Sequence, residues 1–285
     1  MATTIKSSAL DFDTIKANLK NYFAQQSEFS DYDFEASGLN NILDVLAYNT
    51  HINGLTANLA LNEAFLNTAQ LRSSALSHAA NLGYYPRSKT CSQAVVNITA
   101  STTDTVTGSA TLPMFTAFTS TIDNVTYTFN TVNETTALNN GSGGFTFKNQ
   151  DDTSNITIKE GILKTKTFIV GNQSDNAVYI IPDTNVDTST IVIKVFDNVN
   201  SQSFSEYSDI RNSVNITPTS KVYIVREAPN GFYELIFSEG NVLGQAPVAG
   251  NKISVEYLST KGATANNASS FTASTKASIG GANYT

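Results

Sequence analysis

The first third of the chain carries its hydrophobic residues at helical spacing, whereas the remainder alternates as β-strands do. In the helical stretch between residues 34 and 86, whose long helix is expected to open at Ser37 or Gly38, two apolar sets keep helical spacing but are rotated relative to each other: Leu39, Ile42, Leu43 and Leu46, then Tyr48, Ile52, Leu55 and Leu59. A helix that covers one sheet needs a single apolar stripe, so this wider arc predicts packing partners on more than one side. Periodicity alone leaves open whether those partners belong to the same chain.

Two shorter helices are expected beside the long one. Asp11 or Asp13 can cap a first helix, whose apolar face comprises Ile15, Leu19, Tyr22 and Phe23. A third helix is expected to begin with Asn67 as its N-cap and to end with Gly83 as its C-cap. Pro86 prevents that helix from continuing, because proline cannot supply the backbone N–H.

From residue 94 onwards, short alternating segments are bounded by turn residues, which predicts antiparallel β structure rather than βαβ units. The clearest hairpin surrounds Asn230 and Gly231, a pair that supplies the positive φ values of a tight turn. Further turns are expected at Gly240, Gly244 and Gly250. The sequence therefore predicts an α+β fold, in which an N-terminal helical bundle segment is followed by antiparallel β domains.

The change of period and the turn signals divide the chain into four segments. Residues 1–88 form a helical oligomerisation segment, residues 89–150 a first β domain, and residues 151–220 an inserted β domain. Residues 221–285 hold the hairpin and a glycine-rich β segment, which are expected to complete the first β domain, and a C-terminal tail with the composition of a linker.

Composition and charge narrow the classes of partner. The chain has 285 residues and a formal net charge of −7, from 17 basic and 24 acidic residues. It has no run of Lys or Arg that could neutralise phosphates, which argues against nucleic acid as a partner. It also has no apolar segment of about 20 residues and no secretory signal, which argues against a membrane and indicates synthesis in a cytoplasm.

Candidate chemistry is sparse. His51 and His78 lie far apart without acidic or cysteine neighbours at ligand spacing, so no metal or other cofactor is expected. The carboxylates considered as glycosidase acids are Asp151, Asp152, Glu234, Glu239 and Glu256, but such groups are usually solvated surface. Cys91 is the only cysteine, which excludes an internal disulfide, and no histidine can be placed beside it. No serine elbow, Walker or dinucleotide motif is present, so the sequence predicts no enzyme.

Two stretches carry a family resemblance. The first comprises Asp31–Glu35, Gly38–Asn40, Leu43–Asp44, Leu46–Thr50, Leu71–Ser74, Asn81–Tyr84 and Pro86. The second comprises Phe237–Gly240, Gly244, Pro247, Gly250–Asn251, Ile253, Val255, Tyr257, Thr260, Gly262 and Asn266. They resemble the N-terminal portion of the baseplate wedge subunit of T-even-type contractile-tailed phages, within the baseplate J-like family. Between them, Leu112, Pro113, Thr116 and Phe118 resemble the family's first β-arm, with Phe115 where glycine is usual.

The resemblance implies a structural protein of the virion, located in the tail baseplate. Implied partners are a second copy of the chain, other baseplate wedge proteins, and the tail hub and sheath-initiating proteins. It assigns the two apolar sets of the long helix to an intermolecular seam and implies that β domains link wedges around the hub. Because family members usually continue much further, it also implies a truncated or shortened version.

The residues add one feature to the mechanics that the resemblance implies. The connection from Gly83 to Thr90 lies between two structural periods and is expected to act as a hinge when the tail contracts. The alternative reading is a β-rich adhesin or carbohydrate-binding tail module with a helical oligomerisation stalk, which would trimerise alone. A third reading, a tail-associated hydrolase, has no supporting motif.

Overall fold

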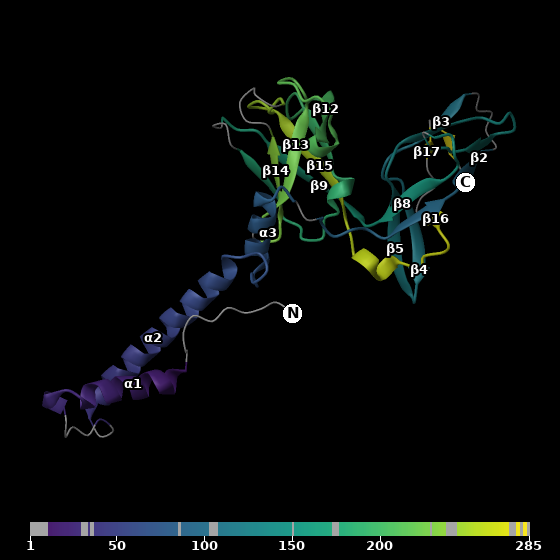
Figure 1. Ribbon diagram of the computed structural model, residues 1–285. Helices are drawn as coiled ribbons and strands as arrows, with labels where there is room; N and C mark the ends of the chain where they lie inside the picture. The colour runs from purple at the N-terminus through teal and green to yellow at the C-terminus, as the bar shows by residue number, and fades with distance from the viewer. Residues whose placement is uncertain are drawn as a thin grey trace. The chain divides into compact units, whose positions relative to one another are not determined.

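The computed structural model describes residues 11–29, 34, 37–84, 87–102, 108–149, 151–172, 177–228, 230–237, 244–273, 278–279 and 282–283. It divides the chain into two compact units, Met1–Pro86 and Arg87–Thr285, here called the helical unit and the β unit (Figure 1). Several residues of the predicted motifs lie outside the described residues: Asp31–Asp33, Glu35, Pro86 and Ser238–Gly240.

The helical unit contains α1 (Phe12–Ala24), the short 3₁₀ helix η1 (Ser27–Phe29), α2 (Gly38–Glu63) and α3 (Arg72–Asn81). Asp11 caps α1, because its carboxylate accepts the backbone N–H of Thr14 at 2.8 Å. At about 1.5 Å per residue, the 26 residues of α2 span about 39 Å. Figure 1 shows α1 lying across the beginning of α2, so the later turns of α2 extend beyond it.

The start of α3 differs from the prediction. The helix begins at Arg72 rather than next to Asn67, so the predicted Asn67 cap is wrong. The carboxylate of Glu63, at the end of α2, instead accepts the N–H groups of Gln70 at 2.9 Å and Leu71 at 3.2 Å. The carboxylate of Glu63, from the preceding helix, therefore accepts backbone N–H groups that a local N-cap side chain would otherwise accept.

The end of α3 has the geometry of a Schellman motif. Gly83 has a φ of +74°, its N–H donates to the carbonyl of Ala80 at 2.9 Å, and the N–H of Tyr84 donates to the carbonyl of Ala79 at 2.9 Å. This pair of bonds satisfies the last carbonyls of the helix, and the left-handed residue between them favours glycine.

The β unit contains two large sheets. The five-stranded sheet has the order β1 (Gln93–Val96), β8 (Ile156–Glu160), β5 (Val125–Thr131), β4 (Ala117–Ile122) and β16 (Thr272–Ala273). The seven-stranded sheet has the order β10 (Val178–Ile181), β14 (Tyr233–Phe237), β13 (Val222–Glu227), β12 (Phe204–Asp209), β11 (Val192–Phe196), β15 (Lys252–Ser259) and β9 (Ile162–Ile169). Within these two sheets every described strand pair is antiparallel except β12 with β13. The predicted α+β class is therefore confirmed.

Smaller elements are also present in the described part of the β unit. Three two-stranded sheets pair β2 (Thr99–Ser101) with β7 (Gly144–Thr146), β3 (Ser109–Leu112) with β6 (Thr135–Leu138), and β17 (Ser278–Ile279) with β18 (Ala282–Asn283). Three 3₁₀ helices are η2 (Thr188–Thr190), η3 (Ile210–Asn212) and η4 (Gly262–Ala265). The largest core, which includes Ile193, Leu235 and Val255, lies on one face of the seven-stranded sheet.

Strand pairing divides residues 151–285 differently from the sequence prediction. The hairpin β13–β14 and the strand β15 join the seven-stranded sheet, together with strands of residues 162–209, instead of completing the first β domain. Only the chain after β15 returns to the five-stranded sheet, where β16 pairs with β4 and Ala265 packs with Phe129 and Ile158. The cause is the long-range pairing of β15 with β9 and β11, which local turn signals do not report.

The predicted turn residues take up several conformations. Among the described residues of the β13–β14 turn, only Gly231 has a positive φ, +79°, and its N–H donates to the carbonyl of Ala228 at 2.9 Å. The side chain of Asn230 accepts the N–H of Phe232 at 3.0 Å. Because β13 ends at Glu227 and β14 begins at Tyr233, the connection is longer than a two-residue turn. Gly244 and Gly250 also have positive φ. Phe115 adopts a φ of +62°, a left-handed conformation at the position where the family usually has glycine.

Candidate functional site

The first turns of α2 pack inside the helical unit. Leu43 and Ala47 are fully buried there, and Leu39 is half-buried. An ion pair of 2.5 Å between Lys16 of α1 and Asp44 of α2 lies beside this contact. Leu43, which the sequence placed in an intermolecular seam, therefore belongs to the core of its own unit.

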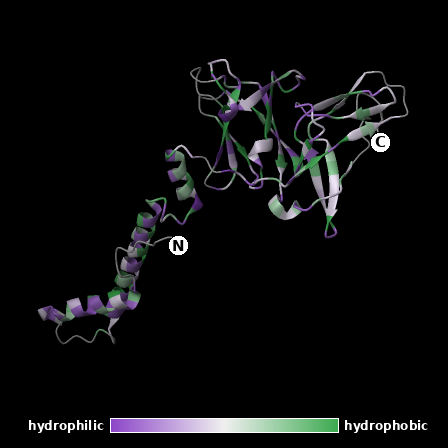
Figure 2. Cartoon of the chain, turned by 45° about the vertical axis from the view of Figure 1, so that its right-hand side comes forward, coloured by the Kyte–Doolittle hydropathy of each residue, from purple (hydrophilic) through white to green (hydrophobic). Residues whose placement is uncertain are grey.

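The opposite side of α2 carries a row of exposed apolar side chains. Five residues follow one another at intervals of three, four, three and four: Val45, Tyr48, Ile52, Leu55 and Leu59. Their exposed fractions run from 38% for Ile52 to 67% for Val45. At about 100° per residue they fall within an arc of about 80°, so they form one continuous strip, here called the α2 stripe. Apolar residues recur along the whole of α2 in Figure 2.

The α2 stripe lacks charge. Between Val45 and Leu59 the sequence contains no Asp, Glu, Lys or Arg, and it contains one histidine, His51. The hydroxyls of Thr50 and Thr56 donate to the carbonyls of Leu46 and Ile52, at 2.8 and 2.9 Å, so they are satisfied within the helix. Depletion of charge around aliphatic and aromatic side chains is typical of the core of a protein–protein interface.

Two further apolar residues form a separate exposed pair. Ile42 is 56% exposed and Leu46 is 43% exposed, and they stand four residues apart on one face. That face is rotated by about 120° from the α2 stripe. The eight residues of the predicted seam thus fall on three sides of α2: Leu39 and Leu43 toward α1, Ile42 and Leu46 on a second side, and the remaining four in the stripe.

Val45 is the stripe residue that sequence reasoning missed. It lies three residues before Tyr48 and seven before Ile52, so a count of alternating three- and four-residue intervals would have included it. The count would also have separated Leu43 from the stripe. The spacing of residues within α2 does not show where α1 packs, and the position of α1 determines which face of α2 stays exposed.

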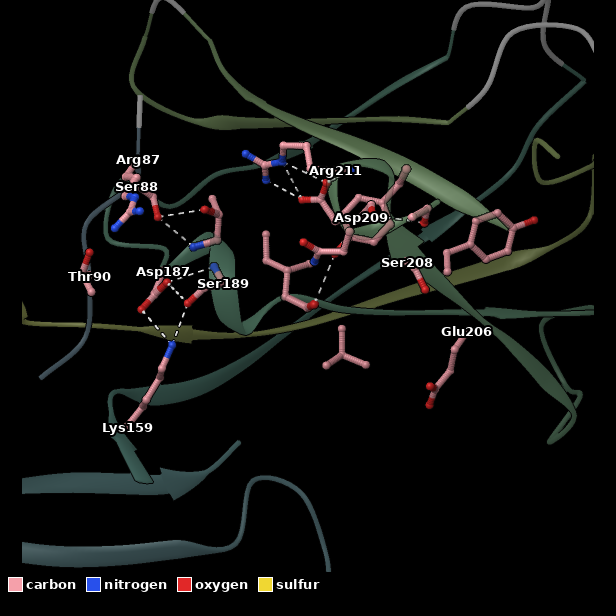
Figure 3. Close-up of a pocket in the computed structure, with 17 residues that line it drawn as sticks. Arg87, Ser88, Thr90, Lys159, Asp187, Ser189, Glu206, Ser208, Asp209 and Arg211 are labelled. Carbon is pink, nitrogen blue, oxygen red and sulfur yellow. Dashed lines mark hydrogen bonds and ion pairs between the residues drawn. The ribbon is translucent and has the colours of Figure 1, made fainter. Parts of the chain in front are cut away.

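The β unit contains a second candidate, a polar groove with a volume of about 710 Å³ (Figure 3). Four of the charged groups that line it form two ion pairs. The Arg211 guanidinium pairs with the carboxylate of Asp209, and the Lys159 ammonium lies 2.7 Å from the hydroxyl of Ser189 and 3.9 Å from the carboxylate of Asp187. Such mutual pairing is typical of a structural polar cluster. Because these groups bind one another, the arrangement does not indicate a proton-transfer site.

The carboxylate of Asp187 is 2% exposed and strongly held. Burial by itself would raise its pKa, but the pKa is lowered because the carboxylate accepts the N–H of Cys91 at 2.9 Å and both the N–H and the hydroxyl of Ser189. Burial and the nearby Asp187 raise the pKa of the Cys91 thiol to about 12. Cys91 is therefore an unreactive core residue at neutral pH.

The remaining catalytic candidates are engaged elsewhere. The ring of His78 lies 2.8 Å from the carbonyl of Glu63, and Glu234 and Glu256 form separate ion pairs with Arg226 and Lys194. The described part of the chain contains no group of three or more His, Cys, Asp or Glu residues that could hold a metal ion. No helix among the described residues is long and apolar enough to cross a membrane.

Comparison with known proteins shows similarity to phage baseplate wedge proteins. Residues 11–84 match the family model for the helical domain of gp6-like baseplate wedge proteins. Over 278 aligned residues the chain is 30% identical to the baseplate wedge protein gp6 of Enterobacteria phage T4. The alignment covers 91% of this chain and 40% of that protein. The resemblance stated from the sequence motifs is therefore confirmed.

Proposed function

We propose, starting from this confirmed likeness to a baseplate wedge protein, that the chain is a structural component of the baseplate wedge of a contractile phage tail. The likeness supports the predicted location in the virion, at the tail baseplate. In this proposal the helical unit joins wedge components in a bundle, and the β unit links wedges around the central hub. The role is mechanical and involves no catalysis.

The observation that carries the proposal is the α2 stripe. Alternating intervals of three and four residues are the pattern of a coiled-coil seam. The a positions are then Val45, Ile52 and Leu59, and the d positions include Tyr48 and Leu55. Two β-branched residues at a and a leucine at d favour a parallel two-stranded arrangement, so the partner helix is α2 of a second copy.

The residues that flank the stripe are compatible with this pairing. In a parallel pair, each g position lies near the e position of the following heptad on the other helix. The facing pairs are then Asp44 with Asn49, His51 with Thr56, and Asn58 with Glu63. No pair brings two like charges together, so nothing at the edges of the seam opposes the association of two copies.

The second exposed face supplies a place for another protein. Ile42 and Leu46 lie to one side of the stripe, beyond α1, and remain exposed when two α2 stripes pair. A helix from a different baseplate wedge protein could cover them and convert the pair into a bundle. Contacts with hub and sheath-initiating proteins, implied by the family resemblance, belong in this proposal to the β unit.

Co-expression with the other tail proteins of the same phage tests the proposal. The mass of the purified complex, measured by native mass spectrometry, is expected to correspond to two copies of the chain together with at least one further wedge protein. A chain that stays monomeric and recovers no tail protein would contradict a wedge role. A trimer formed without any partner would instead favour an adhesin stalk.

A further inference from the structure

The two large sheets of the β unit meet at a junction made of buried polar groups. The chain passes from the five-stranded to the seven-stranded sheet at Gly161, the single residue between β8 and β9. It passes back after β15, through Thr260 and Lys261, into η4. A one-residue connection containing glycine would ordinarily be expected to allow the two sheets to pivot.

The packing around Gly161 opposes such a pivot. Its N–H donates to the carbonyl of Thr128 at 2.9 Å, and its carbonyl accepts the side-chain amide of Asn130 at 2.7 Å. A Cβ at this position would lie 2.9 Å from the Cβ of Leu258. Glycine is needed here for the positive φ of +151° and for close approach to β15. Gly161 is therefore held by hydrogen bonds to β5 on one side and by packing against β15 on the other.

Glu160 ties the two crossings together. Its side chain is on the five-stranded side, is 3% exposed, and accepts the hydroxyl of Thr260 at 2.6 Å and the N–H of Lys261 at 3.1 Å. The N–H of Glu160 in turn donates to the carbonyl of Ser92, whose hydroxyl lies 2.7 Å from the carbonyl of Gly262. One buried carboxylate therefore connects the segment entering the seven-stranded sheet with the segment leaving it.

Asp187 makes a second connection from the other side. It precedes β11 of the seven-stranded sheet and accepts the N–H of Cys91, which leads into β1 of the five-stranded sheet, at 2.9 Å. Lys159 of β8 reaches the same place, 3.9 Å from the carboxylate of Asp187 (Figure 3). The contact with Cys91 is buried, so water cannot readily replace that partner of the carboxylate, whereas the side chain of Lys159 is 17% exposed.

We propose that Glu160 and Asp187 act as a lock that holds the two large sheets of the β unit as one rigid body. Replacing both carboxylates leaves buried donors unpaired and frees the sheets to reorient about Gly161, because methionine accepts no hydrogen bond in place of Glu160 and asparagine keeps only one of the two acceptor oxygens of Asp187. With the lock intact, bending within the chain is confined to the connection between the helical unit and the β unit. This inference rests on the contacts of the β unit alone and stands or falls independently of the proposed function.

Pulsed electron spin resonance on the full chain tests the lock. Spin labels at Val125→Cys of β5 and Thr167→Cys of β9 report the distance between the two sheets, since both positions are exposed. Cys91 stays unlabelled, because it is buried and its pKa is raised to about 12. The unmodified junction is expected to give one narrow distance distribution, and Glu160→Met with Asp187→Asn is expected to widen it at least twofold.

Asp209→Asn is the matched control. That carboxylate is also largely buried and also binds a cation, Arg211, but both residues belong to the seven-stranded side. It should leave the distribution unchanged. A narrow distribution in the double variant, with native circular dichroism, would overturn the proposal. If the double variant does not fold, Thr260→Val and Ser189→Ala each remove one donor to the lock, and an unchanged width in both would equally overturn it.

Discussion

Replacing Leu55 by aspartate tests the α2 stripe at its centre. Leu55 is 50% exposed in the single chain, so about half of its side chain is left to be buried by a partner. Full burial of a leucine contributes about 1.5 to 3 kcal/mol, which makes this residue worth about 1 kcal/mol per copy. Because half of the side chain already faces water, the helical unit itself should tolerate the change.

The carboxylate adds a larger penalty than the lost apolar contact. An unpaired charge taken out of water at the seam costs at least another 1 to 3 kcal/mol, and in a paired helix both copies bear it. The total of about 4 kcal/mol or more corresponds to about a thousandfold weaker association. Sedimentation velocity over a range of concentrations would measure the shift in the dissociation constant.

Ala57→Asp is the control for Leu55→Asp. It introduces the same charge into the same helix at an exposed position on the side away from the stripe. The association of the Ala57 variant should match that of the unmodified chain to within a fewfold. Equal loss in both variants would mean that charge in α2, rather than the stripe, governs association, and loss in neither would refute the seam.

Four smaller predictions concern the folded chain. Leu43→Ala should destabilise the helical unit by about 2 to 5 kcal/mol in thermal denaturation, because the side chain is fully buried. Gly83→Ala should cost about 1 kcal/mol in the same assay, because the φ of +74° is left-handed. The stabilisation from Asp187, whose pKa is lowered in the folded state, should be complete above its ordinary value of 3.8 and lost as pH falls below it. Cys91 should resist thiol reagents at pH 8 until the β unit unfolds.

The helices could be located from sequence because their signals are local. Asp11 caps α1 through a residue three positions away, and Gly83 lies in a Schellman motif built from α3 itself. The start of α3 was missed for the opposite reason, since the group that binds its first N–H groups is Glu63 of the preceding helix. Capping by a carboxylate of the preceding helix produces no recognisable capping motif in the sequence around Asn67.

The sequence alone could not predict which face of α2 is buried and which is exposed. Leu43 and Leu55 have the same side chain in the same helix, yet one is fully buried and the other half-exposed. The difference comes from α1, which covers only the beginning of α2. Periodicity reports that a face is apolar and gives no information about what covers it.

The β unit shows the same limit on a larger scale. Strand positions follow from alternation and turns, but pairing joins Ile193 with Val255 across more than sixty residues. Glu160 and Asp187 look like ordinary surface carboxylates in the sequence, and only the fold buries them among donors. The junction between the sheets was therefore invisible before the structure.

Disulfide trapping at the a position of the α2 stripe tests the central claim most directly. In a parallel, in-register pair of helices, Ile52→Cys places two cysteines within the distance that a disulfide spans. Mild oxidation of the full chain is expected to give a covalent dimer on a non-reducing gel, whereas Ala57→Cys gives none. Absence of a crosslink from Ile52→Cys at concentrations where the chain associates, or equal crosslinking from both positions, would contradict the account.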